Sequence, residues 1–220
     1  MKDRLQRLGG LSAILEALIY ILAFIVYGAV LEFPPTTATA VEELAFLANH
    51  QGTLSLLNIL IYVIFGILLV PSVLAVHQRL KNATPLLSKL ALVFGLIWAG
   101  LVIASGMIGN IGLGAVIDLG TKFPKDAILM WHSITIVTEG LGGGNEIVGG
   151  LWVLLLSMAA LKQKSFPKYL IFLGVIVGTA GLLSLYPAEI FTEIFGLSQI
   201  LWFLWLGIFM LRNSRIKQRY

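Results

Sequence analysis

Long apolar runs limit what this chain can fold into more than any other feature of its sequence. Six stretches are at least about 18 residues long and carry few charges, which is the length that a helix needs to cross a bilayer. Backbone groups inside lipid have no water to bond, so each stretch is expected to form a helix. The predicted fold class is therefore all-α, a polytopic membrane bundle of six transmembrane helices in one domain, residues 1–220. The predicted spans are residues 9–31, 52–76, 89–117, 139–161, 169–187 and 191–211.

The composition agrees with a membrane protein and excludes several other classes. Charged residues make up 12% of the 220 residues, against about 25% in soluble domains, and the mean hydropathy is +0.94. Soluble enzymes, disordered chains and nucleic-acid readers are therefore excluded, and no nucleic-acid partner is expected. Because the chain has no cysteine, disulfides, thiolate nucleophiles and cysteine-bound metal centres are excluded as well.

The positions of the basic residues indicate how the chain is oriented in the membrane. Of the 15 Lys and Arg residues, all but Lys122 and Lys125 lie near the termini or in the second and fourth connections between spans. The first, third and fifth connections instead hold most of the acidic residues. Because basic residues are retained on the cytoplasmic side of a membrane, this alternation predicts six spans with both termini in the cytoplasm.

Two of the outer connections are predicted to contain short interfacial helices. Thr39 and Glu42 have the spacing of a capping box, so a helix is expected from there to about His50. A second helix is expected at about residues 127–138, between Asp126 and the next span. Together with the fourth span it would make 35 continuous residues, too long for one untilted crossing. The glycine-rich run at 140–144 is therefore predicted to interrupt the helix.

Polar side chains in four different spans are predicted to lie at one depth in the outer half of the bundle. Ionisable and amide groups inside a span are costly, so they usually face the interior of the bundle. One interpretation is an outward-facing polar pocket with Glu146 as its charged anchor. The alternative is a ring of interhelical hydrogen bonds that only hold the bundle together. The candidate ligand-binding residues are Glu146, Asn145, Asn110, Asn58, Gln199 and Glu139.

Histidine and carboxylate groups on the outer side keep an enzymatic site among the hypotheses. His50, His132, Asp118 and Glu139 could converge there, although they do not form a compact metal-binding signature. The competing interpretation is that these histidines are interfacial hydrogen-bonding residues. No metal is predicted, and the sequence identifies no cofactor.

Other polar groups fall deeper in the predicted spans. Glu16 lies about seven residues into the first span, and Ser157 lies at a similar depth in the fourth, so the two are expected to pair. Glu16 could act as a proton-relay residue or remain a neutral, hydrogen-bonded carboxyl. Trp152 and Trp202 lie near the middle of their spans, and Trp98 and Trp205 lie a little toward the inside. These tryptophans either line an aromatic cavity or are lipid-facing or packing aromatics.

Three short segments of the sequence resemble a known family. They are Gly9-Gly10-Leu11, the run from Glu139 to Glu146, and Gly149-Gly150-Leu151-Trp152. They are similar to a group of bacterial six-span membrane proteins whose domain has no assigned function, and the similarity extends over about residues 7–213. The resemblance implies a six-helix bundle in a bacterial cytoplasmic membrane. It implies no activity, cofactor or catalytic residue.

The leading functional hypothesis is a non-enzymatic membrane protein that binds or passes a small or amphiphilic molecule through the outward-facing pocket. One alternative is an accessory or structural subunit of a larger membrane complex, and another is a membrane enzyme with an outer His and carboxylate site. The expected partners are the lipid bilayer, a small or lipid-like ligand, and a membrane protein or a second copy of the chain.

Labelling of single cysteines tests the orientation, because the natural chain contains none. A cysteine that replaces Lys125 should react in intact cells with a thiol reagent that cannot cross the membrane. A cysteine that replaces Lys164 should react only after the membrane is permeabilised. The opposite pattern would overturn the predicted orientation.

Overall fold

The computed structural model describes residues 2–143, 146–163, 166–186 and 188–214, and these residues are helical apart from turns and short connections. The all-α fold class is therefore confirmed for this part of the chain. Three short π-helical segments, η1 to η3, continue or join the α-helices. The elements are α1 (Lys2–Ile25), η1 (Val26–Val30), α2 (Ala40–Asn49), α3 (Gln51–Asn58), η2 (Ile59–Ile64), α4 (Phe65–Leu80), α5 (Pro85–Gly120), α6 (Pro124–Thr138), η3 (Glu139–Gly143), α7 (Ile147–Gln163), α8 (Lys168–Leu183) and α9 (Glu189–Arg212).

Apolar helices of membrane-spanning length dominate the structure, so the chain is a multi-pass membrane protein. Five helical segments are long and apolar enough to cross a bilayer, and α8 is a shorter apolar helix of 16 residues. Each of the six predicted spans coincides with one of these segments, with ends that differ by several residues. The five long segments are Asp3–Val30, Gln51–Leu80, Pro85–Gly120, Pro124–Gln163 and Ile190–Arg212.

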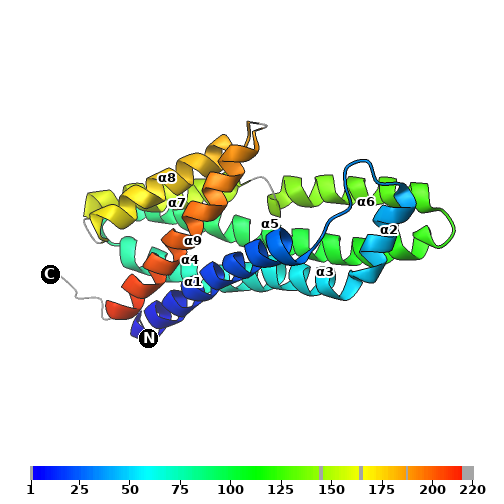
Figure 1. The fold of residues 1–220 in the computed structure, drawn as a ribbon. Coiled ribbons are helices and arrows are strands. Elements are labelled where there is room, and N and C mark those ends of the chain that lie inside the picture. Colours follow the sequence, from blue (N-terminus) through cyan, green and yellow to red (C-terminus); the bar gives the residue numbers. More distant parts are fainter. Residues whose placement is uncertain (1, 144–145, 164–165, 187, 215–220) are drawn as a thin grey trace.

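The helices form a bundle and an arm that share α5 (Figure 1). The bundle consists of α1, α4, α7, α8, α9 and the first half of α5. The arm consists of α2, α3, α6 and the second half of α5, and it has its own small apolar core. With 36 residues, α5 is about 54 Å long, nearly twice the ~30 Å of hydrocarbon in a bilayer. One helix therefore runs through both parts of the molecule.

Arg79 joins several chain segments at the end of the bundle that is farthest from the arm. Its Nε donates a hydrogen bond to Gln6 Oε1 (3.0 Å), and its Nη2 donates to the carbonyl of Asn213 (2.6 Å). The guanidinium also lies over the rings of Phe166 and Phe209. These contacts bring α1, the α4–α5 connection, the α7–α8 connection and the end of α9 together. The described residues of the basic clusters therefore gather at one end of the molecule.

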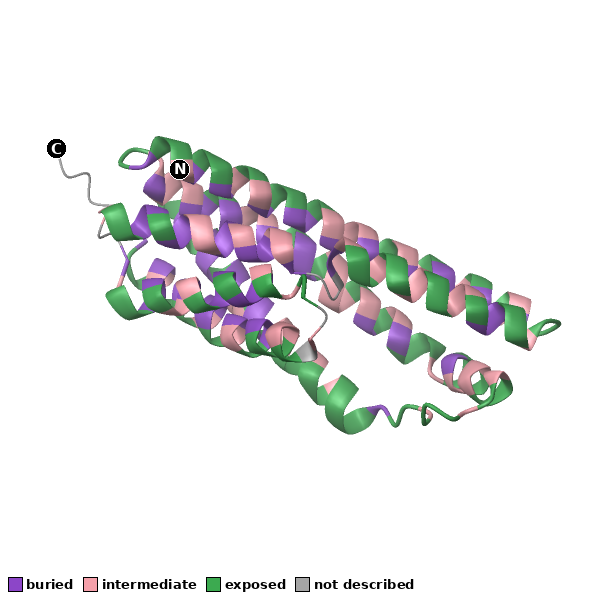
Figure 2. Cartoon of the chain, turned by 90° about the horizontal axis from the view of Figure 1, so that it is seen from above, coloured by how far each residue is buried: buried purple, intermediate pink, exposed green. Residues whose placement is uncertain are grey.

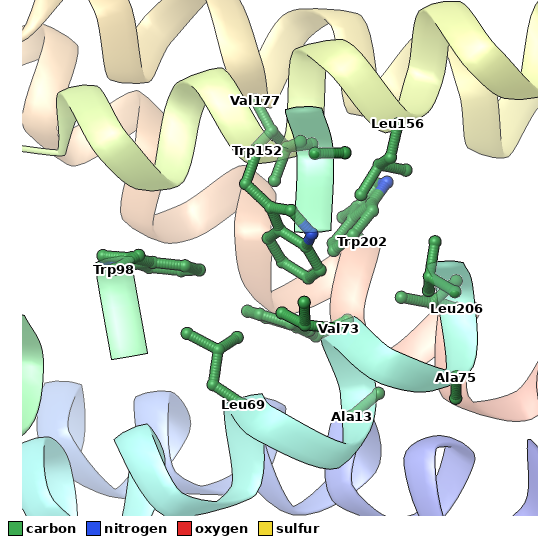
Figure 3. Packing of buried hydrophobic residues seen from close by; sticks show 14 of the residues in the cluster. Ala13, Leu69, Val73, Ala75, Trp98, Trp152, Leu156, Val177, Trp202 and Leu206 are labelled. Atoms are coloured by element: carbon green, nitrogen blue, oxygen red, sulfur yellow. The ribbon is translucent and has the colours of Figure 1, made fainter. Parts of the chain in front are cut away.

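The core of the bundle is built around aromatic rings that contact one another in tilted and edge-to-face arrangements (Figure 3). Trp152 lies between Trp98 and Trp202, with ring centroids 5.8 and 5.5 Å away, and Phe203 contacts all three. Each of the three indoles is 1% exposed. The buried residues gather in the bundle, and exposed residues are more frequent along the arm (Figure 2). The packing interpretation of these tryptophans is therefore the one that the structure favours.

The predicted capping box at the start of α2 is present. The Glu42 carboxylate accepts hydrogen bonds from the backbone N–H (2.7 Å) and the hydroxyl (2.9 Å) of Thr39, and the Glu42 N–H donates back to Thr39 Oγ1. These bonds lower the pKa of Glu42 from its ordinary value. The helix places Leu44 and Leu47 in the core of the arm, between α5 and α6.

The predicted interruption before the fourth span is confirmed, but it shifts the start of that helix. α6 ends at Thr138, η3 follows, and Gly142 has φ 146°, which lies outside helical geometry. α7 then begins only at Ile147. The predicted start at Glu139 is therefore wrong, because the glycine run does not maintain a regular helix. Glu139 and Glu146 precede α7 instead of lying within it.

Glycines allow α7 and α8 to approach at backbone distance. A Cβ atom on Gly150 would lie 2.9 Å from the carbonyl oxygen of Gly178 and from backbone atoms of Gly181. Side chains at these positions would separate the two helices, because backbone atoms cannot move aside independently. The contact is therefore specific for glycine.

Exchange of Gly150 for alanine should destabilise the bundle. Overpacking of a tight contact costs about 1–3 kcal/mol, so the midpoint of thermal unfolding in detergent should fall. Gly100→Ala is the matched control, because no atom lies within 4 Å of the added methyl group. Because alanine forms helix better than glycine by about 1 kcal/mol, this control should not lose stability. Equal midpoints for the two variants would contradict the close contact.

Candidate functional site

Glu146 lies beside a cavity of about 70 Å³ where the glycine junction meets the bundle. The residue is 8% exposed and directly precedes α7. Its backbone is fixed at both ends, because its N–H donates to Ser184 Oγ (3.1 Å) and its carbonyl accepts from Gly150 N–H (2.7 Å). The N-terminus of a helix favours negative charge, so α7 partly offsets the cost of a carboxylate at this position. The residues that line the cavity are Ile19, Tyr20, Ile61, Tyr62, Phe65, Trp98, Val102, Gly142 and Glu146.

Two polar atoms of the cavity lining have no well-formed hydrogen bond. The indole N–H of Trp98 interacts with the Glu146 carboxyl, but its geometry leaves Trp98 Nε1 and Glu146 Oε2 without a hydrogen-bond partner. One atom is a donor and the other an acceptor, and both side chains are more than nine-tenths buried. A buried polar atom without a partner costs about 1–3 kcal/mol. The cavity therefore presents a donor and an acceptor that a small polar molecule can satisfy.

Gln199 extends this polar group from the opposite side of the bundle. It is fully buried in α9, and its Oε1 accepts a hydrogen bond from the Tyr20 hydroxyl (3.4 Å). Its Nε2 has no hydrogen-bond partner. Because Tyr20 lines the same cavity as Glu146, the structure connects two of the sequence-predicted residues, Glu146 and Gln199, through a tyrosine.

Asn58 and Asn110 lie in a different place. Asn110 accepts a hydrogen bond from the Ser55 hydroxyl, and Asn58 packs against Gly109. Both positions are in the arm, between α3 and α5. Asn110 is eight residues beyond Val102 along α5, which corresponds to about 12 Å. The predicted single polar layer is therefore wrong in its geometry, since these two amides form a separate level.

The two remaining candidates are not part of the cavity lining. Glu139 is exposed at the start of η3. Asn145 lies outside the described residues. Of the six predicted residues, Glu146 and Gln199 are thus the two that the structure brings to one site.

The outer histidines make separate contacts. His132 Nε2 on α6 lies 3.3 Å from Glu43 Oε2 on α2, and His50 Nδ1 contacts the carbonyl of Phe46 (2.9 Å). Among the described residues, no three His, Asp or Glu side chains lie close enough together to bind one metal ion. The ion pair between His132 and Glu43 joins α2 to α6 within the arm.

Glu16 pairs with a different helix from the one expected. Its Oε1 accepts a hydrogen bond from Ser72 Oγ on α4 (2.9 Å). Ser157, the expected partner, donates to the carbonyl of Val153 within its own helix (2.7 Å). The prediction is corrected because α1 packs against α4 and α9 along the bundle, and α7 is not among its main neighbours.

Sequence reasoning missed the two tyrosines of the cavity. Tyr20 follows Glu16 by four residues, so both lie on one face of α1. That spacing was the available signal, since a buried carboxyl and a phenol one turn apart indicate a polar face within the bundle. Tyr62 lies in η2, a π-helical segment that helical periodicity does not reveal.

Comparison with known families agrees with the resemblance seen in the sequence. A family model with the description "Domain of unknown function (DUF4386)" matches residues 8–213, which is nearly the whole chain. No curated protein and no solved structure matches the chain.

Exchange of Gly142 for alanine should disturb the cavity through backbone strain. A φ of 146° is disfavoured for residues with a Cβ, at a cost of about 1–3 kcal/mol, whereas the nearest side-chain atom would be 3.5 Å away, an ordinary contact. Thermal unfolding in detergent should therefore show Gly142→Ala to be less stable than Gly140→Ala. Gly140 is the control, because it has ordinary φ and no neighbour within 4 Å. Equal stabilities would mean that the bend does not need glycine at 142.

Proposed function

Because the chain belongs to the DUF4386 family of domains of unknown function, its activity has to be inferred from its own site, and we propose that it binds a small polar molecule beside Glu146. The supporting observation is that Glu146 Oε2 and Trp98 Nε1 make no well-formed hydrogen bond at one cavity. A molecule with both a donor and an acceptor would satisfy both atoms, and a small cation with N–H donors would satisfy the Glu146 oxygen.

The volume of the cavity narrows the class of ligand. About 70 Å³ is well below the ~300–1,000 Å³ of typical drug-sized sites, but it exceeds the ~10–15 Å³ that a cavity needs to hold one water. The cavity therefore suits water, a small cation or a molecule of a few heavy atoms. A larger amphiphilic ligand would require the helices to separate. We therefore favour the small ligand of the two kinds that the sequence suggested.

We propose the following membrane arrangement for this function. The single domain, residues 1–220, crosses a bacterial cytoplasmic membrane six times, with the basic end of the bundle in the cytoplasm. The arm then lies on the outer side, α2 and α6 belong to the outer region, and the cavity beside Glu146 is reached from outside. The clustering of Arg79 with both terminal helices at one end supports this arrangement.

A second candidate function is that of an accessory subunit, and one feature of the arm favours it. α8 belongs to the bundle and has 16 residues, which is a length of about 24 Å. The arm therefore extends well beyond the end of α8. The arm nevertheless exposes Ile111, Leu129 and Ile136, each to about 70%. Apolar side chains outside the hydrocarbon are typical of contact with another protein.

Ligand stabilisation tests the binding proposal. Methylammonium is a suitable probe, because it is small, cationic and an N–H donor, and acetamide is its neutral counterpart. A ligand at a concentration of 100 times its Kd stabilises the folded state by about 2.7 kcal/mol. Wild-type protein in nanodiscs should therefore unfold at a higher temperature with methylammonium, and Glu146→Gln should lose this shift.

Glu193→Gln is the matched control, since Glu193 is exposed on α9, and it should keep the shift. If Glu146 only holds the bundle together, Glu146→Gln should lower thermal stability without changing the response to any probe. That result would contradict the proposed function. A native mass spectrum of the wild type would also show a retained small molecule, or a protein partner of the arm.

A further inference from the structure

A second buried carboxyl lies deeper in the bundle, apart from the cavity. Glu16 on α1 is 0% exposed, and its Oε1 accepts the hydrogen bond from Ser72. Its Oε2 has no hydrogen-bond partner. Glu16 takes no part in the binding site proposed above.

The surroundings of Glu16 do not neutralise a negative charge. The ion pair found among the described residues joins His132 to Glu43 in the arm. From the elements that pack against α1, α4 contributes Ser72 and, nearer the basic end, Arg79; η2 contributes Tyr62; and α9 contributes Gln199. A carboxylate inside a span is costly without a partner. A proton is the smallest species that can neutralise Glu16.

Tyr20 connects Glu16 with the cavity. It lies one turn from Glu16 on the same face of α1, about 6 Å along the helix axis. It lines the cavity together with Glu146 and donates its hydroxyl hydrogen to Gln199. A tyrosine that shares a helix face with one carboxyl and a cavity with the other, where the cavity is large enough for water, can accept a proton on one side and donate one on the other.

Polar groups continue from Glu16 toward the basic end of the bundle. The Ser72 hydroxyl also lies 3.3 Å from the carbonyl of Gly9. Gln6 then donates to the carbonyl of Ala75 (2.6 Å) and accepts from Arg79. From Gln6 to Tyr20, α1 advances about 21 Å. Together with Glu146, these groups extend across most of the ~30 Å of hydrocarbon in a bilayer.

We propose that Glu146 and Glu16 are two stations of a proton path through the bundle, joined by Tyr20 and water in the cavity. The proposal rests on the proposed function, because the outer station is the same carboxyl that binds the ligand. In the inward step, the O–H bond of the Glu146 carboxyl breaks and an O–H bond forms on the Glu16 carboxylate. One proton moves and no oxidant or reductant is needed. Ligand binding at Glu146 would then be linked to proton movement.

Proton flux into liposomes tests the path. Purified protein is reconstituted into vesicles with a trapped pH-sensitive dye, and a potassium gradient with valinomycin sets the membrane potential. Wild-type protein should increase proton entry above that of protein-free vesicles. Glu16→Gln and Glu146→Gln should each lower it to the protein-free level, and the exposed control Glu193→Gln should leave it unchanged. Wild-type flux equal to the protein-free level, or full flux in Glu16→Gln, would overturn the path.

The methylammonium shift separates this proposal from the proposed function. Glu16→Gln should lose proton flux and keep the shift, whereas Glu146→Gln should lose both. A shift in the wild type without any proton flux would overturn the path alone and leave the binding site intact. Loss of the shift in Glu16→Gln would overturn the assignment of separate stations.

Chemical modification keeps the test valid if Glu16→Gln fails to fold. Dicyclohexylcarbodiimide reacts with protonated carboxyls in apolar surroundings, so it should label Glu16 in folded wild-type protein and stop proton flux. Labelled sites are located by mass spectrometry of peptides. Labelling of Glu16 without loss of flux would overturn its role, and loss of flux in proportion to the labelling of Glu16 would support it.

Discussion

The cost of an unsatisfied polar group in an apolar solvent controls this structure. Inside a bilayer the backbone must bond to itself, so the described chain is helical wherever it is apolar. The same cost decides where the backbone departs from regular helix. Regular helix is lost at Gly142, where the junction meets the bundle and the freed groups face a cavity and not lipid. The break in regular helix and the buried carboxyl of Glu146 therefore lie at one location.

Close backbone contact supplies the stability that a hydrophobic core provides in soluble proteins. Lipid is as apolar as leucine, so helices in a membrane gain little from burying leucine against each other. The contact of Gly150 with Gly178 and Gly181 brings α7 and α8 to backbone distance, and the aromatic rings of Trp98, Trp152 and Trp202 fill the centre of the bundle. This packing holds the cavity walls in place, so a polar site can exist beside them.

The sequence predicted the helices well and the site only in part, and the reason is geometric. Apolar length and charge placement reveal where helices run, and the capping box of Thr39 and Glu42 was predicted with its bonds. Depth was estimated by counting from the ends of the helices, which assumes that every helix ends in the same plane. α5 instead continues into the arm, whereas α7 and α9 end at the edge of the bundle. Asn58 and Asn110 were therefore assigned to the level of Glu146 and Gln199, although they lie farther out. Tyr20 and Tyr62 were missed because their role depends on neighbours from other helices.

The packing of α1 against α9 has a consequence for how the protein is made. These two helices are far apart in the sequence, and they lie against each other along the bundle. The hydrogen bond from Tyr20 to Gln199, and the one from Arg79 to Asn213, both depend on α9. During synthesis α1 emerges before α9, so the face of α1 that carries Tyr20 lacks its α9 partner at first. The polar interior is closed only when α9 has also entered the membrane, although α4 can already cover Glu16 through Ser72.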